Sequence, residues 1–177
     1  MRALMLALVV ATALPVVACQ KQEDEGARVL PTPARKPGMW RQVTTVEGLG
    51  AAPPMDMCLD KATDNKLAWW AQQGVRGGCA RNDIKQNADG SWTFASVCEA
   101  PGGIKTITEG TATGDFQSSY KVSAVSTTTG APNLEMNGKR NVTIESTWVG
   151  ECTGDMRPGD IRLPDGNLLN VVELSGG

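Results

Sequence analysis

The chain of 177 residues contains no histidine. This absence excludes a Ser-His-Asp triad, a Cys-His pair and a zinc enzyme with imidazole ligands. The sequence also lacks a G-x-S-x-G elbow, a phosphate-binding P-loop and a C-x-x-C motif. The carboxylates of Asp83, Glu109, Asp115 and Glu145 are available to a glycosidase, but all four fall where strand edges and turns carry solvated acids. We therefore expect a protein that is not an enzyme and that has no cofactor and no metal.

Positive charge is also sparse. The chain has 17 Lys and Arg against 19 Asp and Glu, which gives a net charge of −2, and aromatic residues make up 5%. A nucleic-acid-binding surface needs a basic stripe with interleaved aromatic residues, and no segment has one. We expect no nucleic-acid partner.

A long apolar run occurs only at the N-terminus. Arg2 precedes an apolar segment at residues 3–17, which is too short to remain in a bilayer, and small residues lead up to Cys19. Residues 1–18 are therefore predicted to be a signal peptide. The segment V-V-A-C, which ends at Cys19, resembles the lipobox of bacterial lipoproteins, in which the cysteine becomes the acylated N-terminus. We expect lipidation of Cys19 and attachment to a membrane; the alternative is an unmodified thiol on a soluble periplasmic protein.

The segment after Cys19 has the composition of a spacer. Residues 19–37 contain an acidic run and three prolines and have little apolar content, which indicates a lipidated, disordered tether. Gln20 stands where an aspartate would retain a lipoprotein in the inner membrane of enteric bacteria. By resemblance to that sorting rule, we expect an outer-membrane lipoprotein that faces the periplasm.

Residues 38–177 are predicted to form one disulfide-bonded, β-rich domain. Residues 39–46 fit a first strand, and the turn at residues 87–90 sets Ile84 opposite Phe94 in a hairpin. A second hairpin is predicted from residues 104–113 and 116–126, with Asp115 stabilising its turn. Residues 134–148 have the pattern of one long, bent strand, residues 157–166 that of a loop, and residues 168–174 that of a short edge strand. Leu134, Met136, Val142, Ile144 and Trp148 are expected to share the apolar face of the long strand.

One helix is predicted over residues 61–73, with Asp60 as its cap and Gly74 at its end. Trp69 and Trp70 lie about 100° apart on such a helix, so both rings are not easily buried, and we treat them as a candidate binding surface. The expected fold class is mainly β (α+β): an antiparallel β-meander or curved sheet, a half-barrel, of five to six strands with one inserted α-helix.

Four cysteines remain when Cys19 is set aside: Cys58, Cys79, Cys98 and Cys152. This even set can pair fully in an oxidising compartment, with three possible connectivities. In a meander, Cys79 and Cys98 lie at the same end of the sheet and Cys152 at the other. We therefore favour Cys79 with Cys98 and Cys58 with Cys152, against pairing of the sequence neighbours Cys58 and Cys79.

The one segment with soft-ligand character is residues 55–58, in which Met55, Met57 and Cys58 are candidate ligands for Cu(I). Ordinary packing of the two methionines and oxidation of Cys58 are favoured over copper binding.

Several motifs together resemble one family. They are K-P-G-M-W at residues 36–40, C-L-D-K-A-T at 58–63, C-A-R-N-D at 79–83, W-T-F-A-S-V-C at 92–98, G-T-A-T-G-D-F-Q-S-S-Y at 110–120 and G-E-C at 150–152. The chain resembles domain of unknown function family 3617, small exported proteins of proteobacteria, over about residues 36–160. The resemblance implies an envelope location and a β-rich domain, and it brings no activity and no catalytic residues.

Two functions of different class remain. In the first, the protein is an uncharacterised envelope lipoprotein that binds another envelope protein without catalysis, through a sheet edge or the region of Trp69. In the second, it is a periplasmic carrier or sensor of an apolar small ligand, held in a cavity lined by Ile84, Phe94, Tyr120 and Ile144.

Overall fold

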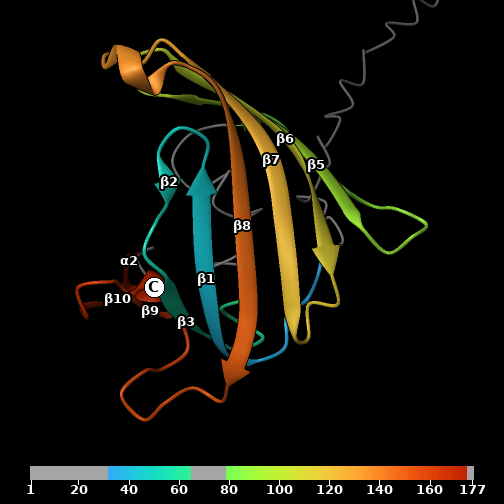
Figure 1. Cartoon of the computed structure of the whole chain (residues 1–177), viewed down its shortest axis with the longest axis vertical. Helices are drawn as coiled ribbons and strands as arrows, with labels where there is room; N and C mark the ends of the chain where they lie inside the picture. The colour runs from blue at the N-terminus through green and yellow to red at the C-terminus, as the bar shows by residue number, and fades with distance from the viewer. Residues whose placement is uncertain (1–31, 65–78, 175–177) are drawn as a thin grey trace, which may run out of the picture.

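The computed structural model describes residues 32–64 and 79–174, which form one antiparallel sheet of ten strands. Nine strands are hydrogen-bonded in the order β10-β9-β3-β1-β8-β7-β6-β5-β4, and β2 pairs with β1 alone. Long central strands curve together along the molecule, while the short strands gather at one side (Figure 1). Within the described ranges β10 and β4 are the two ends of this order, so the sheet is open.

In chain order the strands are β1 (Gly38–Val46), β2 (Gly50–Ala51), β3 (Met55–Leu59), β4 (Cys79–Gln86), β5 (Trp92–Ala100), β6 (Ile104–Gly114), β7 (Ser119–Thr129), β8 (Gly138–Gly150), β9 (Asp160–Arg162) and β10 (Leu168–Asn170). A 3-10 helix, η1 (Leu134–Met136), precedes β8, and one turn of α-helix, α2 (Val171–Leu174), follows β10. Among the described residues, no helix has the length and apolar content needed to cross a membrane.

The expected fold class is wrong in its strand number and in its helix. The sheet has ten strands instead of five or six, and the helices of the described ranges are only η1 and the four-residue α2. The unexpected strands β2, β3 and β9 have two to five residues each, too few to show a clear period-two alternation. The short edge strand expected over residues 168–174 is present as β10, which ends at Asn170 and is followed by α2. The helix expected over residues 61–73 lies largely outside the described residues; its described part, residues 61–64, forms a turn.

The two predicted hairpins are present. Ile84 pairs with Phe94 as expected, and the Asn87 N–H donates to the Ser91 carbonyl over 2.8 Å. In the second hairpin, β6 and β7 pair from Lys105 opposite Thr129 to Gly114 opposite Tyr120. Local turn chemistry therefore identified both hairpins. The second strand of the second hairpin begins at Ser119 instead of the expected residue 116, because Asp115 holds the intervening residues in the turn.

The long strand expected over residues 134–148 is only partly right, because β8 begins at Gly138. Leu134 and Met136 lie on η1 and are 84% and 58% exposed, so they do not join the apolar face. The Asn133 side chain accepts a hydrogen bond from the Glu135 N–H over 3.0 Å, and this cap favours a helical turn over an extended chain. The segment expected to be a loop after Arg157 likewise contains β9.

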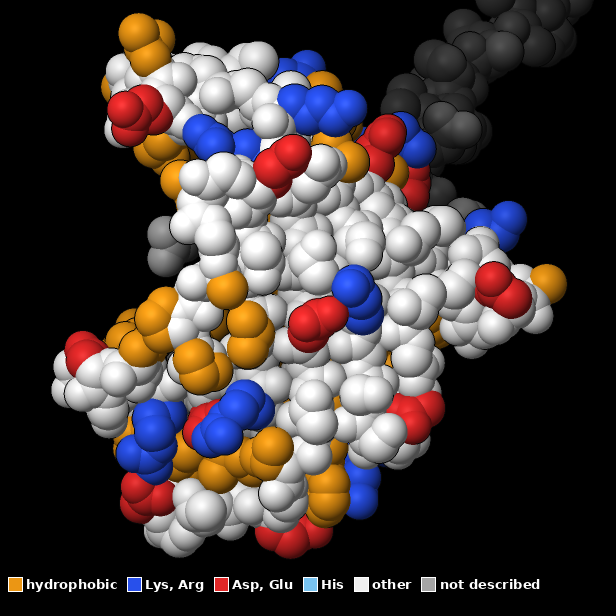
Figure 2. All heavy atoms as spheres, viewed as in Figure 1, with side chains coloured by type: hydrophobic (Ala, Val, Ile, Leu, Met, Phe, Trp, Pro, Cys, Tyr) orange, Lys and Arg blue, Asp and Glu red, His pale blue; other side chains and the backbone are white. Residues whose placement is uncertain are grey.

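The main core lies on one face of the sheet, here called the inner face. Its buried members are Trp40, Met57, Leu59, Trp92, Phe94, Ala112, Phe116, Tyr120 and Val122. Alternation along β1 turns Trp40 to the inner face and Met39 to the outer face, where Met39 packs with Cys58 and Met156. Over the central strands the outer face, seen in Figure 2, consists mostly of backbone and of side chains that are neither hydrophobic nor charged, with scattered charged residues among them.

Gly110 on β6 makes room for an aromatic ring of this core. A Cβ at this position would lie 2.5 Å from Phe94 Cζ and 2.5 Å from the Ser123 carbonyl oxygen on β7. The absent side chain therefore lets the Phe94 ring and the neighbouring strand approach the β6 backbone closely.

Two disulfides join the strands. Cys58 on β3 is bonded to Cys152, which follows β8, and Cys79 on β4 is bonded to Cys98 on β5. This is the pairing that the sequence favoured. A register shift between Cys79 and Arg81 places Cys79 opposite Cys98, so the mismatch implied by the turn at residues 87–90 is absorbed by a β-bulge.

Candidate functional site

Residues 34–37, which we call the strap, lie against the turn between β6 and β7. The Lys36 N–H donates to the Phe116 carbonyl over 2.9 Å, and Gln117 Nε2 donates to the Ala34 carbonyl over 3.3 Å. The strap enters β1 directly, at the end of the sheet where β7 begins (Figure 1). The strap therefore packs on the domain, although the sequence assigned residues 19–37 to the tether and began the domain at residue 38.

Two tryptophans of the sheet hold the strap by its carbonyl groups. Trp40 Nε1 donates to the Lys36 carbonyl over 2.8 Å, and Trp148 Nε1 donates to the Pro37 carbonyl over 3.0 Å. Lys36 Nζ lies 3.4 Å from the centroid of the Trp148 ring, a cation–π arrangement. Gly38 has a φ of +127°, and a Cβ there would lie 2.5 Å from Trp148 Nε1, so only glycine suits this close approach.

Arg35 is the centre of the strap, and its side chain is fully buried. Its Nε donates to Asp64 Oδ1 over 2.7 Å, its Nη2 to the Asp64 carbonyl over 2.8 Å, and its Nη1 to the Tyr120 hydroxyl over 3.2 Å. The Arg35 backbone N–H also donates to Asp64 Oδ2 over 3.1 Å. A buried ion pair is stable only when its donors and acceptors are satisfied in this way. Arg35 therefore ties the strap to the turn after β3 and to β7.

The turn at residues 60–64 presents Asp64 to Arg35. Asp60 Oδ1 accepts hydrogen bonds from the Ala62 N–H over 3.0 Å and the Thr63 N–H over 2.8 Å, as a capping residue would. The Thr63 hydroxyl also donates to Asp60 Oδ1 over 2.8 Å, and this bond is the main cause that lowers the Asp60 pKa. The Asp64 N–H donates to the Asp60 carbonyl over 2.9 Å, which closes the turn.

The β6–β7 turn is built on Asp115. Its Oδ1 accepts three backbone N–H groups, those of Gln117, Ser118 and Ser119, over 2.7 to 3.1 Å. The Ser118 hydroxyl donates to Oδ2 over 2.6 Å, and this bond, followed by the backbone donors, holds the Asp115 pKa well below its usual range. Asp115 thus stabilises its turn, as the sequence predicted.

Phe116 takes a left-handed conformation in this turn, with a φ of +55°. Such a backbone costs an aromatic residue on the order of 1–3 kcal/mol and persists only when its surroundings enforce it. The ring stacks on Tyr120, with centroids 5.2 Å apart and planes at 16°, and the Phe116 carbonyl receives the strap. The strained residue therefore links the turn, the core and the strap.

Sequence reasoning missed Arg35 and Asp64. They are 29 residues apart, and Arg35 stands in a polar, proline-containing stretch whose composition favours disorder. One signal was present: the K-P-G-M-W and G-D-F-Q-S-S-Y motifs, which carried the family resemblance, contact each other through Lys36 and Phe116.

The other candidates from the sequence do not form a site in the described part of the chain. Cys19, Trp69 and Trp70 lie outside the described residues. Met57 is buried on the inner face, whereas Cys58 is in the outer cluster and bonded to Cys152, so residues 55–58 do not converge on a copper ion. No group of three or more His, Cys, Asp or Glu within residues 32–64 and 79–174 is placed to hold a metal.

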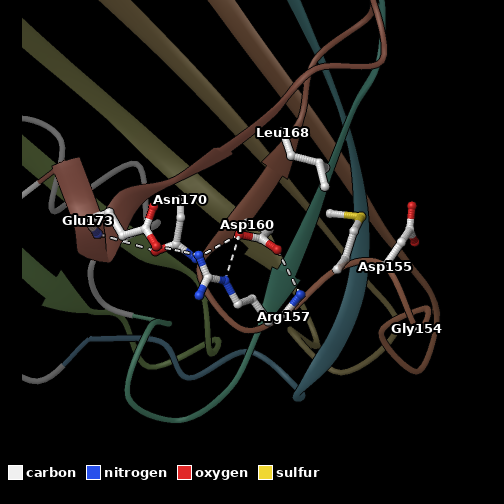
Figure 3. Close-up of a pocket in the computed structure, with 8 residues that line it drawn as sticks. Gly154, Asp155, Arg157, Asp160, Leu168, Asn170 and Glu173 are labelled. Carbon is white, nitrogen blue, oxygen red and sulfur yellow. Dashed lines mark hydrogen bonds and ion pairs between the residues drawn. The ribbon is translucent and has the colours of Figure 1, made fainter.

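A pocket of about 350 Å³ lies in the C-terminal segment after Cys152 (Figure 3). Its lining consists of Gly154, Asp155, Met156, Arg157, Asp160, Leu168, Asn170 and Glu173. Arg157 lies between the carboxylates of Asp160 and Glu173, and Asn170 Nδ2 donates to Asp160 Oδ1 over 2.7 Å. Asp155 pairs with Arg162. Because these charged groups pair with one another, the pocket ties the C-terminal segment together instead of presenting unpaired charges to a ligand.

The fold defines a class of protein: a single open antiparallel sheet with two disulfides, in which an N-terminal strap is hydrogen-bonded to the β6–β7 turn at one end of the sheet. Residues 35–152 match the family described as Protein of unknown function (DUF3617), and the chain belongs to that family. The resemblance seen in the motifs is thereby confirmed. The match begins at Arg35 and ends at Cys152, so it includes both disulfides and the arginine of the strap, whereas the pocket lies beyond it. No curated protein and no solved structure matches the chain.

Proposed function

We propose that this protein is an exported lipoprotein, anchored in the outer membrane through Cys19 and facing the periplasm, whose β-domain binds another envelope component without catalysis. The observation that carries the proposal is the use of the cysteines. The chain has five cysteines, and two disulfides use four of them. The fifth is Cys19, in the V-V-A-C segment, and no other cysteine is left to pair with it. Disulfides of this kind are typical of exported proteins.

The strap gives the anchor a fixed point of attachment on the domain. Thirteen peptide units separate Cys19 from Thr32, the first described residue, and they span at most about 45 Å. Beyond them, the buried Arg35 and the two indole hydrogen bonds hold the chain to the sheet. An acylated Cys19 would therefore hold the folded domain within a short distance of the membrane.

A sheet edge supports the binding role. Within the described ranges β4 pairs only with β5, and residues 80–83 of β4 are exposed. An edge of this kind offers backbone N–H and C=O groups to a strand of another protein. We propose that a partner from the envelope contacts this edge or the region of Trp69 and Trp70.

Fractionation of cells that express the full gene tests the anchor. The wild-type protein is expected in the membrane fraction, and detergent should be needed to release it into the soluble fraction. Cys19→Ala should be absent from the proteins that detergent releases from the membrane. A matched control, C79S/C98S, also removes cysteines and should remain with the membrane. A wild-type protein found in the soluble periplasmic fraction, or a C19A variant that fractionates like wild type, would overturn the anchor.

Site-specific crosslinking tests the edge. A photo-reactive residue at Asn82 on β4 should form one discrete adduct in cells, and the same group at Ser123, at the centre of the outer face, should not. Equal labelling from both positions, or none from Asn82, would exclude β4 as the contact.

A second candidate function, an apolar-ligand carrier, has one observation in its favour. Ile84, Ala124 and Ile144 on the inner face are only partly buried, so some apolar surface remains beside the core. Native mass spectrometry in mild detergent should then detect a lipid-like mass beyond the anchor, which Ile144→Asp should abolish. A spectrum with no such mass in the wild-type protein would dismiss the carrier.

A further inference from the structure

Strand β4 is the long edge of the sheet within the described ranges. It has eight residues and pairs only with β5, whereas the opposite edge strand β10 has three residues and leads directly into α2. Figure 1 shows the β4–β5 hairpin on the side of the sheet away from β9 and β10. A long exposed edge pairs with another strand unless its own side chains prevent it, so the side chains of β4 decide what it can bind.

The backbone of β4 presents its unpaired groups at every second residue. The Asn87 N–H donates to the Ser91 carbonyl, and hydrogen-bonded pairs alternate along an antiparallel ladder, so Lys85 and Asp83 also bond to β5. The residues between them direct their N–H and C=O groups to the open edge. These residues are Asn82, Ile84 and Gln86.

The charged side chains of β4 alternate in sign along the outer face. Ile84 packs on the inner core, so its neighbours Asp83 and Lys85 lie on the outer face, as does Arg81. Arg81 and Asp83 are 56% and 61% exposed and form an ion pair. Glu109 on β6 lies in the same cross-strand row as Asp83, so negative charge gathers at this point of the edge. Charges of one sign would make the strand repel a copy of itself, whereas alternating signs permit pairing.

We propose that β4 pairs antiparallel with β4 of a second copy of this chain, about a two-fold axis at Ile84. In this register Ile84 faces Ile84 of the other copy and Asn82 faces Gln86, and these pairs exchange about six backbone hydrogen bonds in all. Asp83 lies opposite Lys85 on both sides of the axis. The four charges therefore alternate in sign around the axis on the outer face, while the partly buried Ile84 side chains meet on the inner face.

The two neighbouring registers are less favourable. An axis at Asp83 would place the two Asp83 carboxylates opposite each other and Arg81 opposite Lys85, and like charges directly opposite are destabilising. An axis at Asn82 would need residues 79–81, where the ladder between β4 and β5 is interrupted by a bulge. The axis at Ile84 uses only residues 82–86, which are paired regularly with β5.

The pairing closes at two copies. Each chain has one β4 and both copies use it, so no long edge remains within the described ranges. The inference rests on the proposed function in one respect: it takes the β4 edge as the binding surface and names a second copy as its occupant. Pairing over about five residues on each side buries far less area than a stable dimer needs, so the contact is weak by itself. Attachment of both copies to one membrane through Cys19 would raise their effective concentration.

Crosslinking in cells, with chains expressed from the full gene, tests the pairing. A photo-reactive residue at Asn82 should give an adduct of twice the chain mass, because Asn82 faces Gln86 of the other copy. Lys85→Glu and Asp83→Lys should each lower the yield of this adduct by at least about fivefold, because each replaces opposite charges across the axis with like charges. Lys139→Glu is the matched control and should leave the yield unchanged, because Lys139 is exposed on β8 and its reversal alters the net charge as Lys85→Glu does.

Co-expression of the two variants tests the register itself. A dimer of one K85E chain and one D83K chain has opposite charges across the axis on both sides again. The adduct between the two variants, distinguished by tags of different mass, should therefore return to within about twofold of the wild-type yield. Thermal unfolding of each purified variant, expected close to that of wild type, shows that both keep the fold.

Four outcomes contradict the proposal. They are no adduct from Asn82, an adduct with a protein of different mass, an equal loss of yield in Lys85→Glu and Lys139→Glu, and no rescue between the two folded variants. An adduct with a different protein refutes the second copy and leaves the binding role of the β4 edge intact, whereas the absence of any adduct refutes both.

Discussion

The ion pair between Arg35 and Asp64 offers the sharpest test of the strap. The two side chains are 0% and 9% exposed, so removal of one partner leaves an unpaired charge inside the protein. Such a loss typically costs about 3–5 kcal/mol in the free energy of unfolding. Arg35→Met should therefore lower the unfolding temperature by about 10–20 °C in a domain of this size.

Replacement of both charges should restore part of the stability. In R35M/D64L neither charge is left unpaired, and buried ion pairs exchanged for apolar residues of similar volume are often close to neutral. The Tyr120 hydroxyl, the backbone N–H of residue 35 and the carbonyl of residue 64 each lose a partner in this variant, at a cost of about 1 kcal/mol apiece. We therefore expect the double variant to be more stable than either Arg35→Met or Asp64→Leu.

Urea unfolding without reductant, followed by tryptophan fluorescence, measures these differences. The matched control is Arg81→Met, because the Arg81–Asp83 pair is 56% and 61% exposed and its loss should change the stability by less than about 1 kcal/mol. The reasoning fails if Arg35→Met lies within about 1 kcal/mol of wild type, or if the effects of the two single replacements add in the double variant.

Three further predictions concern the rest of the domain. The loop closed by Cys58–Cys152 spans 94 residues and that closed by Cys79–Cys98 spans 19. Loop entropy therefore predicts that C58S/C152S loses about 4.7 kcal/mol and C79S/C98S about 3.2 kcal/mol, and the opposite ranking in urea unfolding would contradict this. Gly110→Ala should lower the free energy of unfolding by about 1–3 kcal/mol, because the new Cβ clashes with Phe94. Gly154→Ala is the control and should be nearly neutral, because no atom lies within 4 Å of its new Cβ. Equal effects of the two replacements would argue against the clash. Because the pKa of Asp115 is lowered in the fold, its carboxylate stabilises the fold fully above the ordinary Asp pKa of about 3.9 and progressively less as the pH falls below that value. The stability lost in Asp115→Asn should therefore be smaller at about pH 3 than at about pH 7. An equal loss at both pH values would show that the charge contributes nothing.

Elements fixed by local chemistry were predictable from the sequence. The turn at residues 87–90 needs only its Asn, Asp and Gly to form, and it placed Ile84 opposite Phe94 correctly. The same holds for β1 and for the β6–β7 hairpin, where Asp115 closes the turn. The motifs identified the family for a related reason, because they mark the segments that contact one another in the fold.

The rest depends on contacts between distant parts of the chain. Arg35 gains its role only when Asp64 and Tyr120 surround it, and a polar stretch with three prolines gives no local sign of burial. The short strand β9 exists because β3 provides a free edge, which its own composition does not reveal, whereas the edge strand β10 was expected from the sequence. At η1 the alternation of Leu134 and Met136 suggested a strand. The conformation was decided instead by the Asn133 side chain, which accepts a hydrogen bond from the Glu135 N–H, and by the Asn137 side chain, which donates to the Ala131 carbonyl.

The central claim is that a domain with two disulfides is attached to a membrane through Cys19. Intact mass spectrometry without reduction, on protein expressed from its full gene in a Gram-negative host and extracted from membranes in mild detergent, tests this claim most directly. The account predicts a chain that begins at Cys19, carries acyl chains, and has four hydrogens fewer than the fully reduced form. A chain that begins at Cys19 without acyl chains, one that retains residues 1–18, or one with free thiols in the domain would contradict it.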